Sequence, residues 1–208
     1  MCPFIESIRI ENGVIYNLPY HNERLNRTRN VFWKDCAPIN LIDYIRMPHE
    51  KGIVKCRIVY EKEIKEIVYA PYSMREIDTL RIVYSDGINY TYKSTDREEL
   101  NRLYVGRGDA DDVLIVRNEL ITDTSIANVA FYDGCEWHTP QTPLLKGTQR
   151  AFLLDRQIIK EKEITLKQLF TYSRITLFNA MIEFGQIEFP VKLSLIHISE
   201  PTRPEPIS

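Results

Sequence analysis

Asn12-Gly13 is the feature that most restricts how this chain can begin to fold. Both residues tolerate the positive φ angles of a type I′ turn, and the β-rich runs beside them, residues 4–10 and 14–16, predict a β-hairpin. Residues 19–34 follow with a proline in the first turn and apolar residues among Arg, Asn and Glu, which indicates a helix. A hairpin followed directly by a helix favours the α+β class.

The remaining elements continue this mixture of strands and helices. The expected helices cover residues 41–46, residues 97–106, and a segment that begins after Gly147 and includes Ile158 and Ile159. The expected strands cover residues 52–60, 64–72, 79–84, 113–116, 126–132 and 136–139, and apolar runs at 166–170 and 175–178 complete the chain. This order predicts a small N-terminal lobe over residues 1–84, a linker over 85–95 and a large lobe over 96–193.

The C-terminal residues differ from the rest of the chain. After Lys192 the sequence reads LSLIHISEPTRPEPIS, which contains three prolines and no periodic pattern. The string SLIHISEPTRP resembles the translation of a sequencing adapter. We therefore expect residues 194–208 to be a non-native tail that takes no part in the fold.

Composition limits the kinds of partner. Of the 208 residues, 44% are hydrophobic and 27% are charged, and the formal net charge is −2. Such a chain can bury a core, and it lacks the strongly basic balance typical of a dedicated nucleic-acid binder. The expected partner is a small molecule.

Cysteine spacing and the N-terminal residues indicate in which compartment of the cell the protein is expected. The four cysteines form no C-x-x-C pair, so we expect neither a metal site nor a disulfide framework. Glu6 and Arg9 interrupt the stretch that would have to be the apolar core of a signal peptide, and no later run approaches the ~18 apolar residues of a membrane helix. A cytoplasmic protein without a membrane partner is expected.

Considered one at a time, the candidate functional residues also allow ordinary structural explanations. His21 and Arg24 share one face of the first helix and could bind an anion or remain solvated. Lys93 is a Schiff-base nucleophile if the linker buries it, and otherwise a surface lysine. Asp123 fits an Asx turn at a strand end, and residues 147–150 open a helix whose N–H groups could hold phosphate or be capped.

Taken in order, these residues lie within a set of motifs that resembles the class IV aminotransferases, the fold-type-IV pyridoxal-phosphate family. The resemblance spans about residues 4–191 and implies a two-lobed α+β enzyme with pyridoxal phosphate between the lobes. It also implies a homodimer that acts on a small-molecule amine. The motifs are FIESIR, HNERL, KCRIVY, YKSTDR, ITDTSIANVAFYDG, WHTPQTPLLKGTQR and LFNAMIEFG.

The resemblance implies roles for residues that would contact the cofactor. Lys93 matches the Schiff-base lysine, and Arg24 matches the ligand of the cofactor phosphate. Two backbone turns match the family's phosphate cradles, where N–H groups supply donors without competing charge. They are Gly147-Thr148-Gln149 and Asn179-Ala180.

Three further residues are matched less directly. Asp123 stands where the family usually has glutamate, five residues before the matched Asn128, and would face the pyridine nitrogen and favour its protonated form. Arg57 matches a strand position that reaches the substrate carboxylate in some relatives, although a cross-strand ion pair explains it equally well.

The residues after Lys93 bear on the reaction. The sequence Lys-Ser-Thr-Asp-Arg at residues 93–97 resembles the K-x-x-N-R pattern of the 4-amino-4-deoxychorismate lyases. The resemblance therefore favours release of p-aminobenzoate and pyruvate in folate synthesis. The alternatives are an aminotransferase for branched-chain or D-amino acids, and a non-catalytic relative that binds pyridoxal phosphate.

Overall fold

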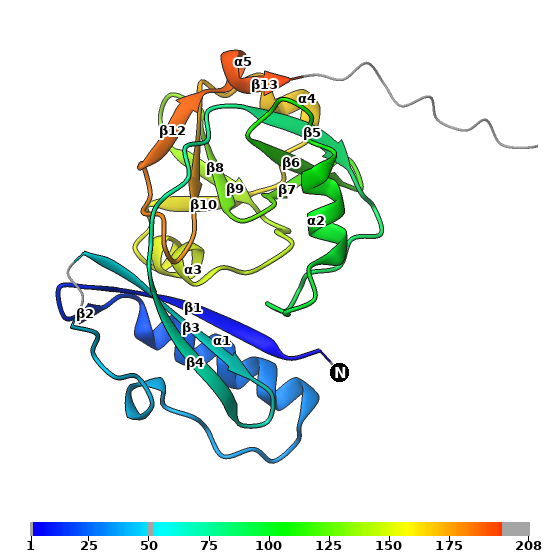
Figure 1. Ribbon diagram of the computed structural model, residues 1–208. Coiled ribbons are helices and arrows are strands. Elements are labelled where there is room, and N and C mark those ends of the chain that lie inside the picture. Colours follow the sequence, from blue (N-terminus) through cyan, green and yellow to red (C-terminus); the bar gives the residue numbers. More distant parts are fainter. Residues whose placement is uncertain (1, 50–51, 197–208) are drawn as a thin grey trace, which may run out of the picture.

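The computed structural model describes residues 2–49 and 52–196. Its first part is an antiparallel sheet with the strand order β2-β1-β3-β4. The sheet consists of β1 (Phe4–Glu11), β2 (Val14–Ile15), β3 (Ile53–Tyr60) and β4 (Ile64–Pro71), and α1 (Leu18–Phe32) packs beside it (Figure 1). Positive φ angles of 49° at Asn12 and 78° at Gly13 confirm the predicted hairpin turn.

The second part contains two more sheets. One has the order β13-β5-β6-β7 and is formed by β5 (Leu80–Tyr84), β6 (Asp112–Arg117), β7 (Leu120–Thr124) and β13 (Leu195–Ile196). The other has the order β10-β9-β8-β11-β12 and is formed by β8 (Asn128–Tyr132), β9 (Trp137–Pro140), β10 (Ile159–Lys162), β11 (Arg174–Phe178) and β12 (Ile187–Pro190). The short helices are η1 (Leu41–Asp43), α2 (Glu98–Val105), α3 (Thr148–Asp155), α4 (Leu166–Leu169) and α5 (Val191–Ser194).

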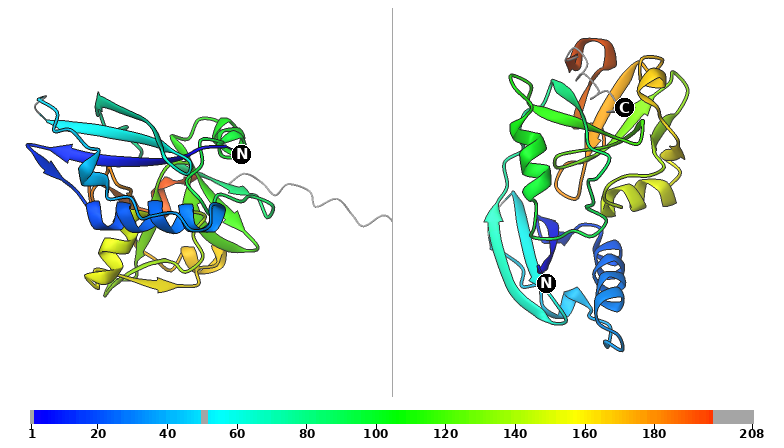
Figure 2. Two further views of the ribbon diagram at one scale, coloured as in Figure 1. Left: turned by 90° about the horizontal axis from the view of Figure 1, so that it is seen from below. Right: turned by 90° about the vertical axis from the view of Figure 1, so that its right-hand side faces the viewer.

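The molecule has two lobes, seen one above the other in Figure 1 and in the right view of Figure 2. The small lobe contains β1–β4 and α1, and its apolar core includes Ile8, Ile10 and Leu25. The large lobe has a separate core, which joins side chains from both of its sheets. Contacts between α1 and α3 hold the lobes together, among them a hydrogen bond from Tyr20 Oη to Asp155 Oδ2 at 2.9 Å.

The predicted lobe boundary at residue 84 is wrong. The chain leaves β4 and crosses to the large lobe before β5, because β5 pairs in parallel with β6. It then returns to the small lobe, where Ile5 N donates to Lys93 O at 2.8 Å and Thr95 N donates to Pro3 O at 2.8 Å. The predicted linker is therefore held against the start of β1 (Figure 1).

Several predicted element boundaries also need correction. The helix predicted through Ile158 and Ile159 ends at Asp155, since Gln157 takes a left-handed φ of 57° and Ile159 begins β10. The strand predicted from residue 126 begins at Asn128, and the preceding strand β7 had no separate prediction. The predicted helix at 41–46 is only the single turn η1.

Three residues of the expected tail belong to the fold, and the first of them, Ser194, is the last residue of α5. Leu195 and Ile196 form β13 and pair in parallel with β5, which corrects the expectation that nothing after residue 193 joins a sheet. The rest of the expected tail, residues 197–208, lies outside the described residues. Among the helices that are described, none has the length and apolar character needed to cross a membrane.

Candidate active site

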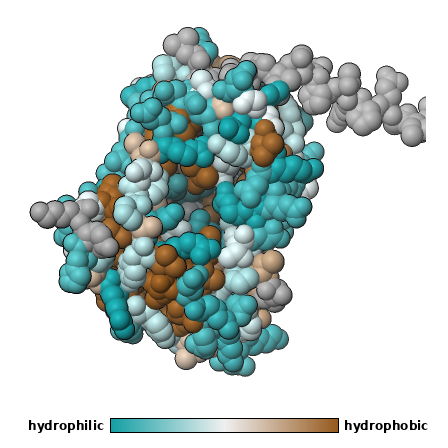
Figure 3. Space-filling view, in the orientation of Figure 1, coloured by the Kyte–Doolittle hydropathy of each residue, from teal (hydrophilic) through white to brown (hydrophobic). Residues whose placement is uncertain are grey.

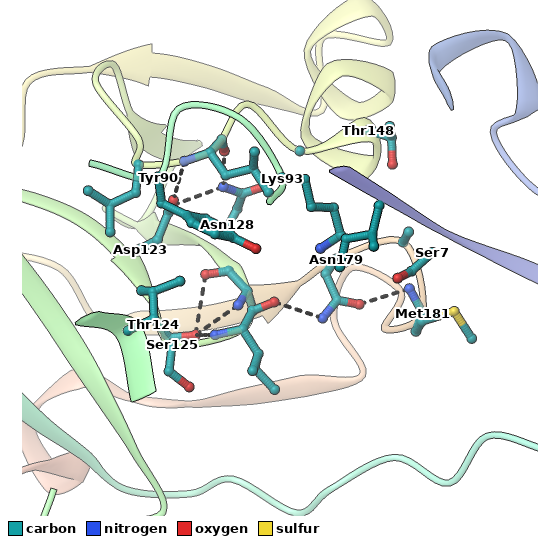
Figure 4. A pocket seen from close by; sticks show the side chains of 18 of the residues that line it. Ser7, Tyr90, Lys93, Asp123, Thr124, Ser125, Asn128, Thr148, Asn179 and Met181 are labelled. Atoms are coloured by element: carbon teal, nitrogen blue, oxygen red, sulfur yellow. Dashed lines mark hydrogen bonds between the residues drawn. The ribbon is translucent and has the colours of Figure 1, made fainter. Parts of the chain in front are cut away.

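A cavity of about 320 Å³, here called the central cavity, is lined by residues of both lobes. All the residues assigned roles from the sequence line it except Gln149. The assigned residues that line the cavity are Arg24, Arg57, Lys93, Asp123, Asn128, Gly147, Thr148, Asn179 and Ala180. Figure 4 shows the labelled members of this group around the cavity.

Lys93 lines the cavity from a segment whose backbone is hydrogen-bonded to the start of the chain. Beyond the bonds to β1, Tyr90 Oη donates to Ser94 O at 2.8 Å. Burial and, secondarily, the positive charge of Arg24 lower the pKa of Lys93 from 10.5 to about 7, against the opposing effect of Glu6. A large fraction of this amine is therefore unprotonated at neutral pH, as a nucleophile or base requires.

Arg24 is held by a carboxylate that the sequence analysis assigned no role. Glu6 on β1 is fully buried and accepts from Arg24 Nε at 2.8 Å and from Nη2 at 2.5 Å. Burial would raise the pKa of Glu6, but Arg24 and His21 outweigh it and lower the pKa from 4.5 to about 2. Among the contacts between described residues, none engages Nη1 of Arg24, which can donate to another acceptor.

Asp123 and Asn128 form a fixed pair at another wall of the cavity (Figure 4). Asn128 Nδ2 donates to Asp123 Oδ1 at 2.8 Å, and Leu145 N donates to Oδ2 at 2.9 Å. Burial raises the pKa of Asp123 to about 6 against these two hydrogen bonds. Asp123 is therefore largely ionised at neutral pH, yet it holds a proton more readily than an exposed carboxylate.

Gly147 is fixed by its contact with the same amide. A Cβ atom on this residue would lie 2.1 Å from Asn128 Oδ1, so only glycine fits beside that side chain. The next residue, Thr148, begins α3 and lines the cavity. The start of this helix therefore offers backbone N–H groups toward the cavity.

The second expected phosphate cradle is a tight turn stabilised by Asn179. Its Oδ1 accepts from Met181 N at 2.8 Å and from Ile182 N at 3.0 Å, while Nδ2 donates to Ile126 O at 3.1 Å. This arrangement presents Ala180 to the cavity.

Gln149 differs in position from the other matched residues. Its Oε1 accepts from Asn17 Nδ2 at 2.5 Å, and the residue does not line the central cavity. The side chain joins α3 to the residue before α1, so its place is between the lobes.

The position of Arg57 is compatible with both roles considered from the sequence, a contact with substrate and a cross-strand ion pair. It lines the cavity from β3, and its Nη1 lies 3.7 Å from Glu66 Oε2 on β4. The structure adds two cations that the sequence analysis gave no role, Lys55 and Arg97. Arg97 Nη2 donates to Ser125 O at 2.7 Å, which joins the segment after Lys93 to the turn between β7 and β8.

Basic residues outnumber acidic ones around the cavity. Arg24, Lys55, Arg57, Lys93 and Arg97 line it, and Asp123 is the only carboxylate among its described lining residues. Sequence spacing gave no sign of this charge, because the cations come from α1, β3, the linker and the residue before α2. A period-2 pattern in β1 does mark Glu6, which lies on the apolar face shared with Phe4 and Ile8.

A second cluster of potential ligand atoms lies outside the cavity. Ligand atoms of Asp133, Glu136 and His138 lie within 4.8 Å of one another at the hairpin between β8 and β9. Lys160 already pairs with Glu136, and His138 Nε2 lies 2.9 Å from the same carboxylate. Lys160 therefore offsets part of the negative charge of this cluster.

Comparisons with known proteins agree with the fold. Residues 61–188 match the family described as amino-transferase class IV. Over 185 residues the chain is 37% identical to an uncharacterized protein of Haemophilus influenzae. The matched region covers 87% of this chain and 98% of the relative.

Solved structures show the same architecture. A crystal structure of a putative 4-amino-4-deoxychorismate lyase from Haemophilus somnus has a TM-score of 0.83 and 34% identity, and covers 88% of this chain and 98% of that one. A putative amino-acid aminotransferase from Mesorhizobium loti has a TM-score of 0.79 and covers 94% of this chain and 100% of its own, but at 19% identity it shows the fold alone. The predicted α+β fold of type IV is confirmed, and the chain belongs to the class IV aminotransferases, a family of pyridoxal-phosphate-dependent enzymes.

Proposed function

We propose that this protein is a 4-amino-4-deoxychorismate lyase, which releases p-aminobenzoate and pyruvate for folate synthesis in the cytoplasm. The observation that carries the proposal is the positive charge of the central cavity. Similarity to the Haemophilus somnus protein, itself named a putative lyase of this kind, supports the same reading.

The charge favours a substrate with two carboxylates. Aminodeoxychorismate carries one carboxylate on its ring and another on its enolpyruvyl group, whereas a branched-chain amino acid carries one. If Arg24 holds the cofactor phosphate and Lys93 reacts, then Lys55, Arg57 and Arg97 remain for substrate anions. Guanidinium groups bind carboxylates in a bidentate manner and stay charged at any working pH.

The residues present fit pyridoxal phosphate. Nη1 of Arg24, the start of α3 and the turn at Ala180 would hold the phosphate, and Asp123 would face the ring nitrogen. The fit at Gly147 is specific, because any side chain there would displace Asn128 from Asp123.

The cofactor, when bound, supplies an electron sink for the negative charge that develops at the substrate carbon. Lys93 would first act as the nucleophile that binds the cofactor and then as the base that removes the proton from the carbon bearing the amine. The lowered pKa of about 7 suits both tasks, since the amine can accept and release a proton near neutral pH. Asp123 would keep the ring nitrogen protonated.

The assay separates the lyase from the aminotransferase. The holoenzyme is incubated with aminodeoxychorismate, and separately with branched-chain or D-amino acids plus 2-oxoglutarate, while p-aminobenzoate, pyruvate and glutamate are measured. The lyase should form p-aminobenzoate and pyruvate in equal amounts. Rapid glutamate formation without p-aminobenzoate would instead establish an aminotransferase, and no turnover would favour a non-catalytic relative.

The site assignments have their own tests. Borohydride reduction followed by peptide mapping should place the cofactor on Lys93, and a label on another lysine would refute the assignment. Arg24→Ala should lose cofactor on dialysis, whereas Arg27→Ala should retain it, because Arg27 is exposed on the same helix and pairs only with Glu23 at 3.4 Å among the contacts described. Equal retention by the two variants would show that Arg24 does not hold the phosphate.

We also propose that the protein acts as a homodimer. The edge strand β4, the segment before β3 and the segment after β4 expose apolar side chains, including Val68, Met47 and Met74 with 42%, 47% and 43% of their surface accessible. Figure 3 shows apolar side chains gathered on the small lobe on the face it displays. Sedimentation equilibrium should give twice the chain mass, and Val68→Lys should weaken the association if this face is used.

A further inference from the structure

His21 connects the two lobes at one end of the central cavity. Its imidazole is fully buried, with Nδ1 2.5 Å from Glu6 Oε2 on β1 and Nε2 3.3 Å from Thr148 Oγ1 at the start of α3. Glu6 also holds Arg24, so one buried carboxylate orients both Arg24 and, through His21, Thr148. Both of these residues line the cavity.

The protons in the hydrogen-bonded series Glu6–His21–Thr148 can be assigned by counting donors. Glu6 is ionised, since its pKa lies near 2, and an ionised carboxylate only accepts hydrogen bonds. His21 Nδ1 therefore carries a hydrogen and donates it to Glu6. Nε2 then has two states: unprotonated, it accepts the hydroxyl hydrogen of Thr148, and protonated, it donates to the Thr148 oxygen.

These two states differ in what Thr148 can offer to the cavity. A hydroxyl has one hydrogen, so Thr148 cannot donate both to His21 and to a bound anion. When Nε2 is protonated, the hydroxyl hydrogen of Thr148 is released and can turn toward the cavity. A protonated His21 also places a positive charge near the same end.

We propose that an anion bound between Arg24 and Thr148 makes His21 take up one proton, so that this end of the cavity binds phosphate together with a proton. The inference rests on the part of the proposed function that places the cofactor phosphate at this end. His21 is thus a positioning residue: it does not line the cavity itself but acts through Thr148.

The charged groups around His21 are consistent with proton uptake on anion binding. Glu6 on β1 favours the protonated imidazole, while Arg24 on α1 and Lys93 on the linker oppose it, and α3 contributes the uncharged Thr148. Burial is the largest cause of the lowered pKa of His21, so the imidazole is neutral while the cavity holds no anion. An anion that offsets Arg24 and Lys93 reverses this preference.

Sulfate is the suitable probe, because it stays a dianion between pH 5 and 9 whereas inorganic phosphate titrates in that range. The chain has four histidines, and side-chain NMR of the isotopically labelled full-length protein can follow each imidazole through a pH titration. Spectra of His21→Gln and His138→Gln assign two of the signals. Saturating sulfate should raise the pKa of His21 by at least one unit.

The binding constant gives a second readout. If binding takes up one proton, the association constant for sulfate rises by at most about tenfold for each unit by which the pH falls. His21→Gln and Thr148→Val should each lose this part of the pH dependence, whereas His138→Gln should keep it. Lys93 and Asp123 titrate in all four proteins, so the difference between variants isolates His21.

Three results would overturn the inference: a His21 pKa that sulfate leaves unmoved, a pH slope that survives in His21→Gln, or no sulfate binding at this end of the cavity. The outcome is separable from that of the proposed function. An active lyase without the pKa change refutes only this inference, while the pKa change in a protein that forms no p-aminobenzoate refutes only the lyase.

Discussion

Glu6→Gln should lower the free energy of unfolding at neutral pH by about 3 kcal/mol, because glutamine keeps the size of the side chain but removes its charge. Arg24, only 7% exposed, would then be a buried cation without its counterion. Removal of one partner from a buried ion pair typically costs about 3–5 kcal/mol. The pKa of Glu6 gives a similar value, since a fall from 4.5 to about 2 corresponds to about 3 kcal/mol.

The pH dependence has a definite sign. A carboxyl group whose pKa is lowered by folding stabilises the protein fully above its unfolded pKa, and this contribution is lost as the pH falls through the folded value. The difference between wild type and Glu6→Gln should therefore be largest above pH 5 and roughly half as large at pH 3. Urea unfolding followed by tryptophan fluorescence at both pH values measures it.

Glu11→Gln is the matched control on the same strand. Glu11 pairs with Arg9 at 2.6 Å but is partly exposed, and Arg9 keeps Glu183 as a second partner at 3.2 Å. This control should cost about 1 kcal/mol or less. If Glu6→Gln cost no more than Glu11→Gln, or if its effect did not shrink in acid, the buried ion pair would not have the role argued for it.

Further predictions concern the cavity and the C-terminal strand. Gly147→Ala should destabilise the protein by about 1–3 kcal/mol and weaken cofactor retention, whereas Gly87→Ala, where a Cβ meets nothing within 4 Å, should do neither; urea unfolding and cofactor absorbance test both. Because folding raises the pKa of Asp123 to about 6, its stabilising contribution should be lost as the pH rises from about 4 to 6, and unfolding of Asp123→Asn should lack this loss. Deletion of the residues after Ile196 should leave the melting temperature unchanged, whereas a deletion that also removes β13 should lower it, because β13 pairs with β5.

The first hairpin turn and most of the longer elements followed from local signals in the sequence. Asn12-Gly13 predicts its turn because the required positive φ angles are a property of those two residues, and the structure shows them. The order of the motifs likewise indicated the family and the residues to expect in a site. The structure brings all of these except Gln149 to one cavity.

Other elements depended on contacts between distant segments. Ile158 and Ile159 continue an apolar pattern that suits a helix, yet Ile159 pairs with Trp137 in a parallel strand. A short apolar run cannot distinguish these outcomes, because the strand is stabilised only by a neighbour more than twenty residues away. The same holds for β5, which local pattern assigned to the first lobe and pairing with β6 placed in the second.

The sequence by itself determined which residue types were available for chemistry, and it placed Glu6 on an apolar face where a charge needs a partner. Only the tertiary structure decided that the partners are Arg24 and His21, and that His21 reaches Thr148 in the other lobe. The lowered pKa of Lys93 has the same origin, since it follows from burial and from nearby charges contributed by separate strands and helices. Turn angles depend on a few adjacent residues, whereas burial and charge pairing depend on the whole packed chain, so the chemistry of this cavity exists only once both lobes have come together.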